Sequence, residues 1–203
     1  MIDLKQYIHR STLWLSDAGT LAPWMLTGNM ENLIVEKIKA LGTDYKIFND
    51  VAVHRNASID SHAIIKGPAI IAAKCFIGAH AYLRGGIFLD ENVTVGPGCE
   101  LKTTFIFSGS AVAHFNFIGD SLVGSNVNLE AGAIVANHYN ERKHKNITVS
   151  VAGTSFSTGV EKFGALIGDY TKIGANAVLS PGTILPPNTI VKRLELIDQN
   201  PEK

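Results

Sequence analysis

The chain has 203 residues, of which 46% are hydrophobic, and its 18 basic residues balance 18 acidic ones. This length predicts one domain, or one domain with a small appendage, with a sizeable core, and the apolar content excludes an intrinsically disordered segment. Zero net charge argues against a general nucleic-acid or anionic-membrane binder. Charged residues make up 18% of the chain, below the roughly 25% usual for soluble domains, which indicates surface hidden in an oligomer.

The sequence shows no secretion or membrane signal. Its first residues lack a basic stretch followed by an apolar one, and no apolar run reaches the roughly 18 residues of a membrane span. We therefore expect a cytoplasmic protein without membrane contact. Cys75 and Cys99 are too few for a disulfide framework or a zinc site, and we expect both to be buried thiols.

Residues 1–46 differ in kind from the rest. Apolar residues at helical spacing, with Gly42 as a stop signal, predict a helix from Asn29 to Leu41. We expect this segment to cover the open end of the structure that follows, because an exposed strand edge invites aggregation.

A six-residue repeat follows this segment. Every sixth residue from Val53 to Phe107 is large and apolar, and two further runs follow. A period of six differs from the roughly 3.6 of a helix and the roughly 2 of a flat strand, and it is typical of a parallel β-helix. The repeats predict about six triangular coils over residues 47–193, with a tail at 194–203, and the period leaves the hand of the coil open. The repeated positions are Val53, Ile59, Ile65, Ile71, Ile77, Leu83, Leu89, Val95, Leu101 and Phe107, then Phe117, Val123, Leu129 and Val135, then Ile167, Ile173, Leu179, Leu185 and Val191.

One interruption, near residues 137–164, is too polar for a wall of the coil. We expect an extruded loop there, and loops on rigid scaffolds often carry function.

Polar residues cluster where the apolar register slips, between Phe107 and Phe117. His114 lies at the slip. Because imidazole titrates close to neutral pH, a histidine aimed into a groove there can act as a general base. The alternative interpretation is that His114 is a solvent-exposed histidine at a corner of the coil, hydrogen-bonded to a carbonyl group and without a catalytic role. The other polar residues of this region are Arg84, Lys102, Asn116, Asn128 and Asn137.

Residues 81–147 resemble the acetyltransferase domain of the bifunctional glucosamine-1-phosphate acetyltransferase/N-acetylglucosamine-1-phosphate uridylyltransferase family. The spacing from Arg84 through His114 to Asn137 is kept without a gap, and the stretches 161–169 and 174–182 resemble archaeal-type members. Residues 22–26 resemble the linker between the two domains of these relatives, and we expect no nucleotidyltransferase domain in this chain. The motifs of the resemblance are Ala81-Tyr82-Leu83-Arg84, Glu100-Leu101-Lys102, Ala113-His114 through Gly119-Asp120, Asn126 through Ala133, and Ala136-Asn137.

The resemblance implies an all-β, left-handed parallel β-helix that forms a homotrimer with active sites shared between subunits. It also implies acetyl transfer from acetyl-CoA to the amine of a hexosamine phosphate such as glucosamine 1-phosphate, without a metal. His114 would take the proton of the attacking amine. Arg84 and Lys102 would bind the phosphate, a role that suits their chemistry. The residues assigned to the sugar substrate are Asn116, Phe117, Asn128, Asn137 and His138, and those assigned to acetyl-CoA are Ala131, Ala175, Lys192 and Arg193.

The sequence departs from the family at three positions. Phe117 and His138 replace two tyrosines, Glu130 replaces a glycine, and the last coils are short. These departures leave open a protein that binds a sugar phosphate or nucleotide sugar without catalysis, and they make a nucleotide-linked amino sugar the second candidate acceptor. A zinc hydratase of the carbonic anhydrase type is a further alternative. That class needs three converging histidines, and His62 and His80 lie one coil apart.

Overall fold

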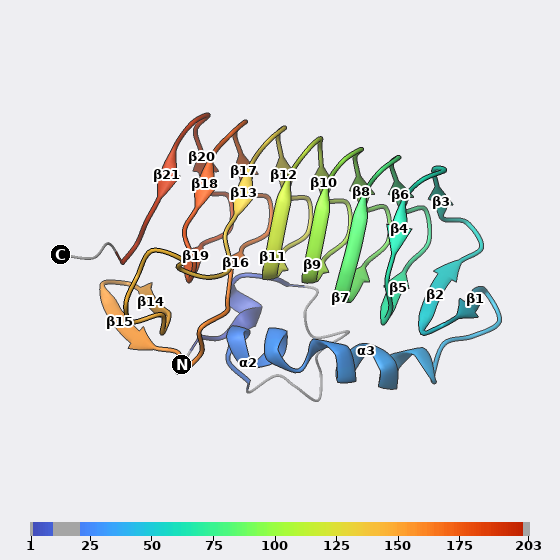
Figure 1. The fold of residues 1–203 in the computed structure, drawn as a ribbon, viewed down its shortest axis with the longest axis horizontal. Helices are drawn as coiled ribbons and strands as arrows, with labels where there is room; N and C mark the ends of the chain where they lie inside the picture. Colours follow the sequence, from blue (N-terminus) through green and yellow to red (C-terminus); the bar gives the residue numbers. More distant parts are fainter. Residues whose placement is uncertain (1, 10–20, 201–203) are drawn as a thin grey trace.

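The computed structural model describes residues 2–9 and 21–200, which form a parallel β-helix with short helices along one side (Figure 1). Part of the predicted N-terminal segment, residues 10–20, lies outside these ranges. The predicted β-helix is confirmed. One of its faces has seven strands, one from each coil, so the coil count is seven where the repeats predicted about six.

Three strand faces enclose the core. On the second face β6 pairs with β3 on one side and β8 on the other, all in parallel. Strands β7, β9 and β11 bend around one corner and so belong to both the third and the first face. The first face comprises β2 (Val51–His54), β5 (Ala69–Ile71), the second halves of β7 (Tyr82–Leu89), β9 (Glu100–Ile106) and β11 (Phe117–Val123), β16 (Ala165–Ile167) and β19 (Thr183–Leu185). The second face comprises β3 (Ser58–Ile59), β6 (Phe76–Ile77), β8 (Thr94–Val95), β10 (Ala111–Val112), β12 (Asn128–Leu129), β17 (Lys172–Ile173) and β20 (Ile190–Val191). The third face comprises β4 (Ile64–Ile65), the first halves of β7, β9 and β11, β13 (Ile134–Val135), β18 (Val178–Leu179) and β21 (Leu196–Ile197).

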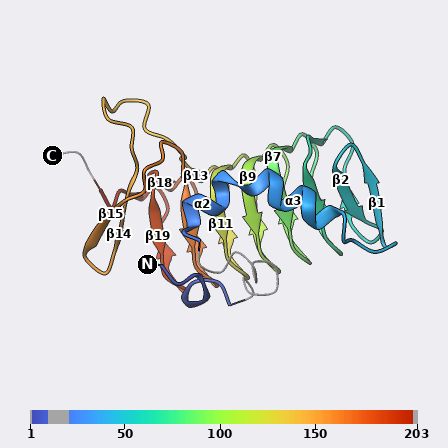
Figure 2. The same ribbon diagram turned by 90° about the horizontal axis from the view of Figure 1, so that it is seen from below.

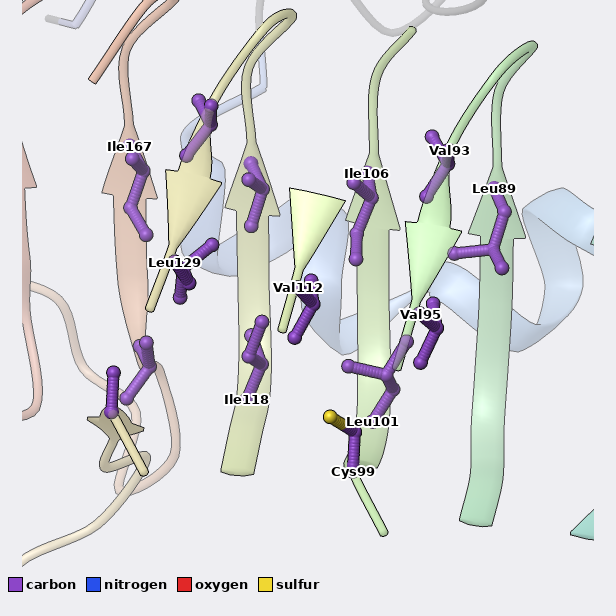
Figure 3. Close-up of a cluster of buried hydrophobic side chains, with 14 of the residues drawn as sticks. Leu89, Val93, Val95, Cys99, Leu101, Ile106, Val112, Ile118, Leu129 and Ile167 are labelled. Carbon is purple, nitrogen blue, oxygen red and sulfur yellow. The ribbon is translucent and has the colours of Figure 1, made fainter. Parts of the chain in front are cut away.

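The inside of the coil is filled by stacked aliphatic side chains (Figure 3). Cys75 and Cys99 lie among them as free thiols, as expected, and burial raises the pKa of Cys75 to about 11. Ile106 and Ile118 point inward and are fully buried. They take the inward positions that the six-residue register had given to Phe107 and Phe117, and that part of the prediction is wrong.

The slip in register has a local cause. Paired residues are 18 positions apart between Tyr82 and Glu100 but 17 apart between Glu100 and Phe117. The change occurs at a bulge between Arg84 and Ile87, where Gly85 and Gly86 have positive φ. The next two coils therefore turn the same corner with one residue fewer.

A second apolar cluster lies outside the first face. Phe88, Phe105 and Phe107 project outward and pack against one another, with Phe88 and Phe105 centroids 5.5 Å apart. Apolar residues of α2 (Pro23–Gly28) and α3 (Met30–Ile38), among them Leu26 and Ile34, complete this cluster.

The predicted helix is present, but its position differs from the expectation. Helices α2 and α3 run along the side of the coil (Figure 2), because the phenylalanines of the first face give their apolar stripe a partner. At the open end, β1 (Tyr45–Phe48) instead adds one antiparallel strand to β2. A short 3₁₀ turn, η1 (Leu4–Gln6), lies near the N-terminus. No helix in the described ranges is long and apolar enough to span a membrane.

The predicted loop leaves the coil after Asn137 and returns at Gly164, and it contains a hairpin of β14 (Thr148–Val151) and β15 (Thr154–Ser157). Buried Ile147 and Phe163 pack it against the outer cluster. Tyr139 donates a hydrogen bond to the carbonyl of Pro181 at 2.9 Å. The interruption therefore leaves the coil but is anchored to it.

The inward position of Ile118 can be tested by its contribution to the free energy of unfolding. Replacing Ile118 by alanine removes a fully buried side chain and is expected to lower the free energy of unfolding by about 2–5 kcal/mol. Ile47→Ala, at a side chain that is 49% exposed, is the control and should cost about 1 kcal/mol or less. Urea unfolding measures both. Equal losses would contradict the inward assignment of Ile118.

Candidate active site

Two corners of the β-helix carry the predicted site residues. The corner between the third and first faces holds Arg84, Lys102, Asp120 and Asn137 on successive coils, and we call it the cation edge. Arg84 donates from Nε to Glu100 Oε1 at 2.8 Å. The guanidinium also lies 5.7 Å from the ring centre of Tyr82. Its side chain stays about one-third exposed, so it can still meet a ligand.

Asp120 organises the rest of this edge. Its carboxylate accepts from Lys102 Nζ at 2.7 and 3.0 Å and from the Asn137 side-chain amide. Asp120 is 7% exposed and has a φ of 45°, a conformation that aspartate tolerates better than most residues. His138 is exposed, with Nδ1 3.2 Å from Asn137 Oδ1. Lys102 and Asn137 are thus held by one buried carboxylate, whereas Glu100 holds Arg84.

The corner between the second and third faces holds the predicted base and the predicted acetyl-CoA residues. We call it the histidine edge. Backbone bonds stack it coil on coil: Gly132 N donates to His114 O, Asn176 N to Ala131 O, and Leu194 N to Ala175 O. His114 is exposed and therefore free to meet a substrate. On one chain His114 and Lys102 lie on opposite edges of the third face, with the half-buried ring of Phe117 between them.

Glu130 has a defined partner on the histidine edge. Its two oxygens accept from Arg193 Nε and Nη2 at 2.8 Å, and Oε2 also accepts from Ala175 N at 2.9 Å. The Arg193 hydrogen bond and then the Ala175 amide hold the pKa of the Glu130 carboxyl below its usual value. The acid that replaces the family's glycine therefore engages two of the groups that the resemblance assigns to acetyl-CoA.

This corner also borders a groove of about 470 Å³. Asn128, Lys172 and Lys192 line it beside Glu130 and Arg193. The predicted residues Asn128, Lys192 and Arg193 are thus close together. Lys172 is a cation of this groove that the sequence did not single out, although it pairs directly with Asn128 on the neighbouring coil.

Asn116 has a structural role in place of the expected substrate contact. Its side chain is 2% exposed, and its Oδ1 accepts from Ala133 N at 2.8 Å while its Nδ2 donates to His114 O at 3.2 Å. The amide closes the corner beneath His114 and offers no surface to a ligand.

The histidine pair considered for zinc lies elsewhere. The His62 and His80 rings stack nearly parallel, with centroids 5.5 Å apart. In the part of the chain that the structure describes, no three metal-ligating side chains gather at one point.

The Glu130 link predicts a pH dependence. Because the folded pKa is lowered, the carboxylate stabilises the fold fully at neutral pH, and this contribution is lost as the pH falls through the folded pKa. At about pH 7 the urea midpoint of the wild type should therefore be higher than that of Glu130→Gln. The difference between the two midpoints should disappear at about pH 3. A gap that persists unchanged at acid pH would contradict this ion pair.

The chain is similar to two curated relatives over most of its length. The bifunctional sugar-1-phosphate nucleotidylyltransferase/acetyltransferase of Sulfurisphaera tokodaii is 37% identical over 155 residues, covering 75% of this chain and 38% of the relative. The bifunctional protein GlmU of Methanococcus maripaludis strain C5 is 36% identical over 190 residues, covering 89% of this chain and 44% of the relative. The resemblance based on the His114 region is confirmed, and the chain spans less than half the length of these relatives.

Solved structures give weaker likenesses. A hexapeptide transferase family protein from Anaplasma phagocytophilum has a TM-score of 0.44 at 20% identity and covers 72% of each chain. The acetyltransferase domain of PglB from Neisseria gonorrhoeae has a TM-score of 0.31 at 15% identity, covering 92% of this chain and 68% of that one. No protein-family model matches the chain.

Proposed function

We propose that this chain is an acyl-CoA-dependent N-acyltransferase that moves an acetyl group onto the amine of an amino-sugar phosphate. The observation that carries the proposal is the unbroken spacing from Arg84 through His114 to Asn137, in a chain similar to a relative named as a bifunctional nucleotidylyltransferase/acetyltransferase. The β-helix supports it by placing these residues on two adjoining edges of the same coils.

In the proposed reaction the amine nitrogen attacks the thioester carbonyl, a carbon–nitrogen bond forms and the carbon–sulfur bond breaks. His114 takes the proton from the nitrogen, and the leaving thiolate of CoA receives a proton. The exposed imidazole at the histidine edge suits this task, and Ala131 lies on the next coil of the same edge. Rigid placement of both substrates supplies the rest of the rate through proximity.

The phosphate of the acceptor would bind at the cation edge. Arg84 offers a planar fork of donors and Lys102 a compact positive charge, and both side chains are fixed by carboxylates. Because these cations lie on the edge opposite to His114, we propose that two neighbouring copies in a trimer complete each site. The half-exposed apolar residues Phe117 and Ile134, on the third face between the edges, are the surface that a neighbour would cover.

A binding protein without catalysis is the second candidate. Arg193 and the amide of Ala175 are already satisfied by Glu130, so acetyl-CoA must compete for them.

Release of free CoA thiol from acetyl-CoA, with glucosamine 1-phosphate and a series of amino-sugar phosphates and nucleotide-linked amino sugars, tests the proposal. We expect turnover with one acceptor and an oligomer in light scattering. Acceptor binding without thiol release across the series would favour the second candidate.

A further inference from the structure

A cavity of about 580 Å³ lies beside the cation edge, under the junction of α2 and α3. Its walls come from three separate parts of the chain: the helix junction at residues 24–32, corner residues of three successive coils, and residues 160–162 of the loop. None of the residues assigned to the sugar or to acetyl-CoA lines it. The volume lies within the range of small-molecule sites.

The cavity adjoins the predicted phosphate site through two residues. Asp120 lines it, and the same carboxylate holds Lys102 Nζ at 2.7 Å. Gly85, directly after Arg84, also lines it. The helices that roof the cavity pack on the first face, whereas Phe117 and Asn128 lie on the third and second faces. A phosphate at the cation edge would therefore have the sugar on one side and this cavity on the other.

We propose that the acceptor is a nucleotide-linked amino sugar, and that its nucleoside occupies this cavity. The inference rests on the proposed function for the position of the phosphate. A sugar monophosphate ends at its phosphate and would leave the cavity unused. A nucleotide sugar continues beyond its phosphates, in the direction where the cavity lies.

The walls have the groups that a nucleoside needs. Trp24 is half-buried in the wall and held edge-on against Phe163, with ring centroids 5.9 Å apart, and an aromatic ring is a stacking partner for any base. Exposed Asn29 and Asn32 offer amide donors and acceptors for base edges, and their side chains are joined by a 2.8 Å hydrogen bond. The Glu31 carboxylate is exposed in the same wall and can accept from ribose hydroxyls.

Gly28 allows the cavity to be filled without disturbing the predicted catalytic residues. It lines the cavity, has no positive φ, and a Cβ atom built on it meets no atom within 4 Å beyond its own helix. Gly28→Phe should therefore fold and occupy the cavity. Gly42→Phe is the matched control, because Gly42 is equally open and lies outside the cavity lining.

Isothermal titration with a panel of nucleoside diphosphates, and with pyrophosphate as a probe without a base, tests the inference. We expect at least one nucleoside diphosphate to bind wild type at least tenfold more tightly than pyrophosphate. Gly28→Phe should lose this advantage, and Gly42→Phe should keep it. Equal binding of nucleoside diphosphates and pyrophosphate, or a Gly28→Phe variant that binds like wild type, would overturn the inference.

Two further outcomes separate this inference from the proposed reaction. Nucleotide binding that Gly28→Phe removes, without any thiol release from acetyl-CoA, would uphold the nucleoside site and reject the acyl transfer. Turnover of glucosamine 1-phosphate, with a disaccharide phosphate binding more tightly than any nucleotide, would uphold the transfer and assign the cavity to a second sugar, which overturns the inference.

Discussion

His114→Ala is expected to lower kcat for acetyl transfer by about 10²–10⁴-fold, the usual range for loss of a general base. KM for the acceptor should change little, because the phosphate is expected to bind at the cation edge and not at His114. The exposed imidazole makes few contacts that stabilise the fold, so the urea midpoint should stay close to that of wild type. Thiol release from acetyl-CoA under saturating acceptor measures the effect.

His9→Ala is the matched control for this loss. His9 is also exposed, and its backbone nitrogen donates a hydrogen bond to Asp169 Oδ2 at 3.0 Å, which alanine at this position keeps. Its activity should equal that of wild type. A His114→Ala variant that retains more than about a tenth of wild-type kcat would remove His114 from the role of base.

Sharing of the site between copies adds a second readout. His114→Ala and Lys102→Met change opposite edges of the third face, and each alone should inactivate every site of a homo-oligomer. If each site takes one edge from each of two copies, co-refolding the two inactive variants produces some sites with both edges intact. Activity should then reappear. Mixtures that stay inactive would indicate that one chain supplies both residues.

The architecture was predictable because the inside of a coil demands a large apolar residue at each turn of the repeat. The error at Phe117, on the third face, follows from the shortened corner, because Ile118 and Val123 are both inward and only five residues apart. The same rule explains the error at Phe107. On the first face both sides of the strand are apolar, since Phe105 and Phe107 pack outward against the helices. Composition cannot separate an inner from an outer residue where both sides of a strand are buried. The covered outer face also explains why the helices lie along the side of the coil.

The repeat indicated where the cations and the histidine of the proposed site lie, but not which groups hold them. Lys102 and Asp120 are 18 residues apart, one coil of an unbroken six-residue repeat, so the repeat favoured a contact between them although the strands pair Lys102 with Gly119. Arg84 and Glu100 are 16 apart, and their contact depends on side chains reaching across the paired strands. The cavity under the helices was beyond prediction, because its three walls meet only through tertiary packing.

Asp120→Asn is the variant with the largest expected effect on the cation edge. Asparagine keeps the shape and tolerates the positive φ of 45°. It leaves the Lys102 ammonium, whose side chain is only 19% exposed, without its carboxylate. Removing one partner of a buried ion pair costs about 3–5 kcal/mol, and the partial exposure of Lys102 places the expected loss at about 3 kcal/mol. Urea unfolding measures it.

Glu36→Gln is the control, because it makes the same chemical change in the exposed ion pair with Lys39, where a loss of at most about 1 kcal/mol is expected. The kinetic constants KM and kcat of Asp120→Asn then show whether Asp120 positions the phosphate-binding groups or only stabilises the fold. Since Asp120 holds both Lys102 and Asn137, its loss should raise KM for a sugar phosphate by more than it lowers kcat. Adding Lys102→Gln to Asp120→Asn should recover part of the lost stability but none of the affinity for phosphate. A double variant that is less stable than Asp120→Asn alone would contradict this explanation. It would show that Asp120 stabilises the corner through its other hydrogen bonds and not by neutralising Lys102.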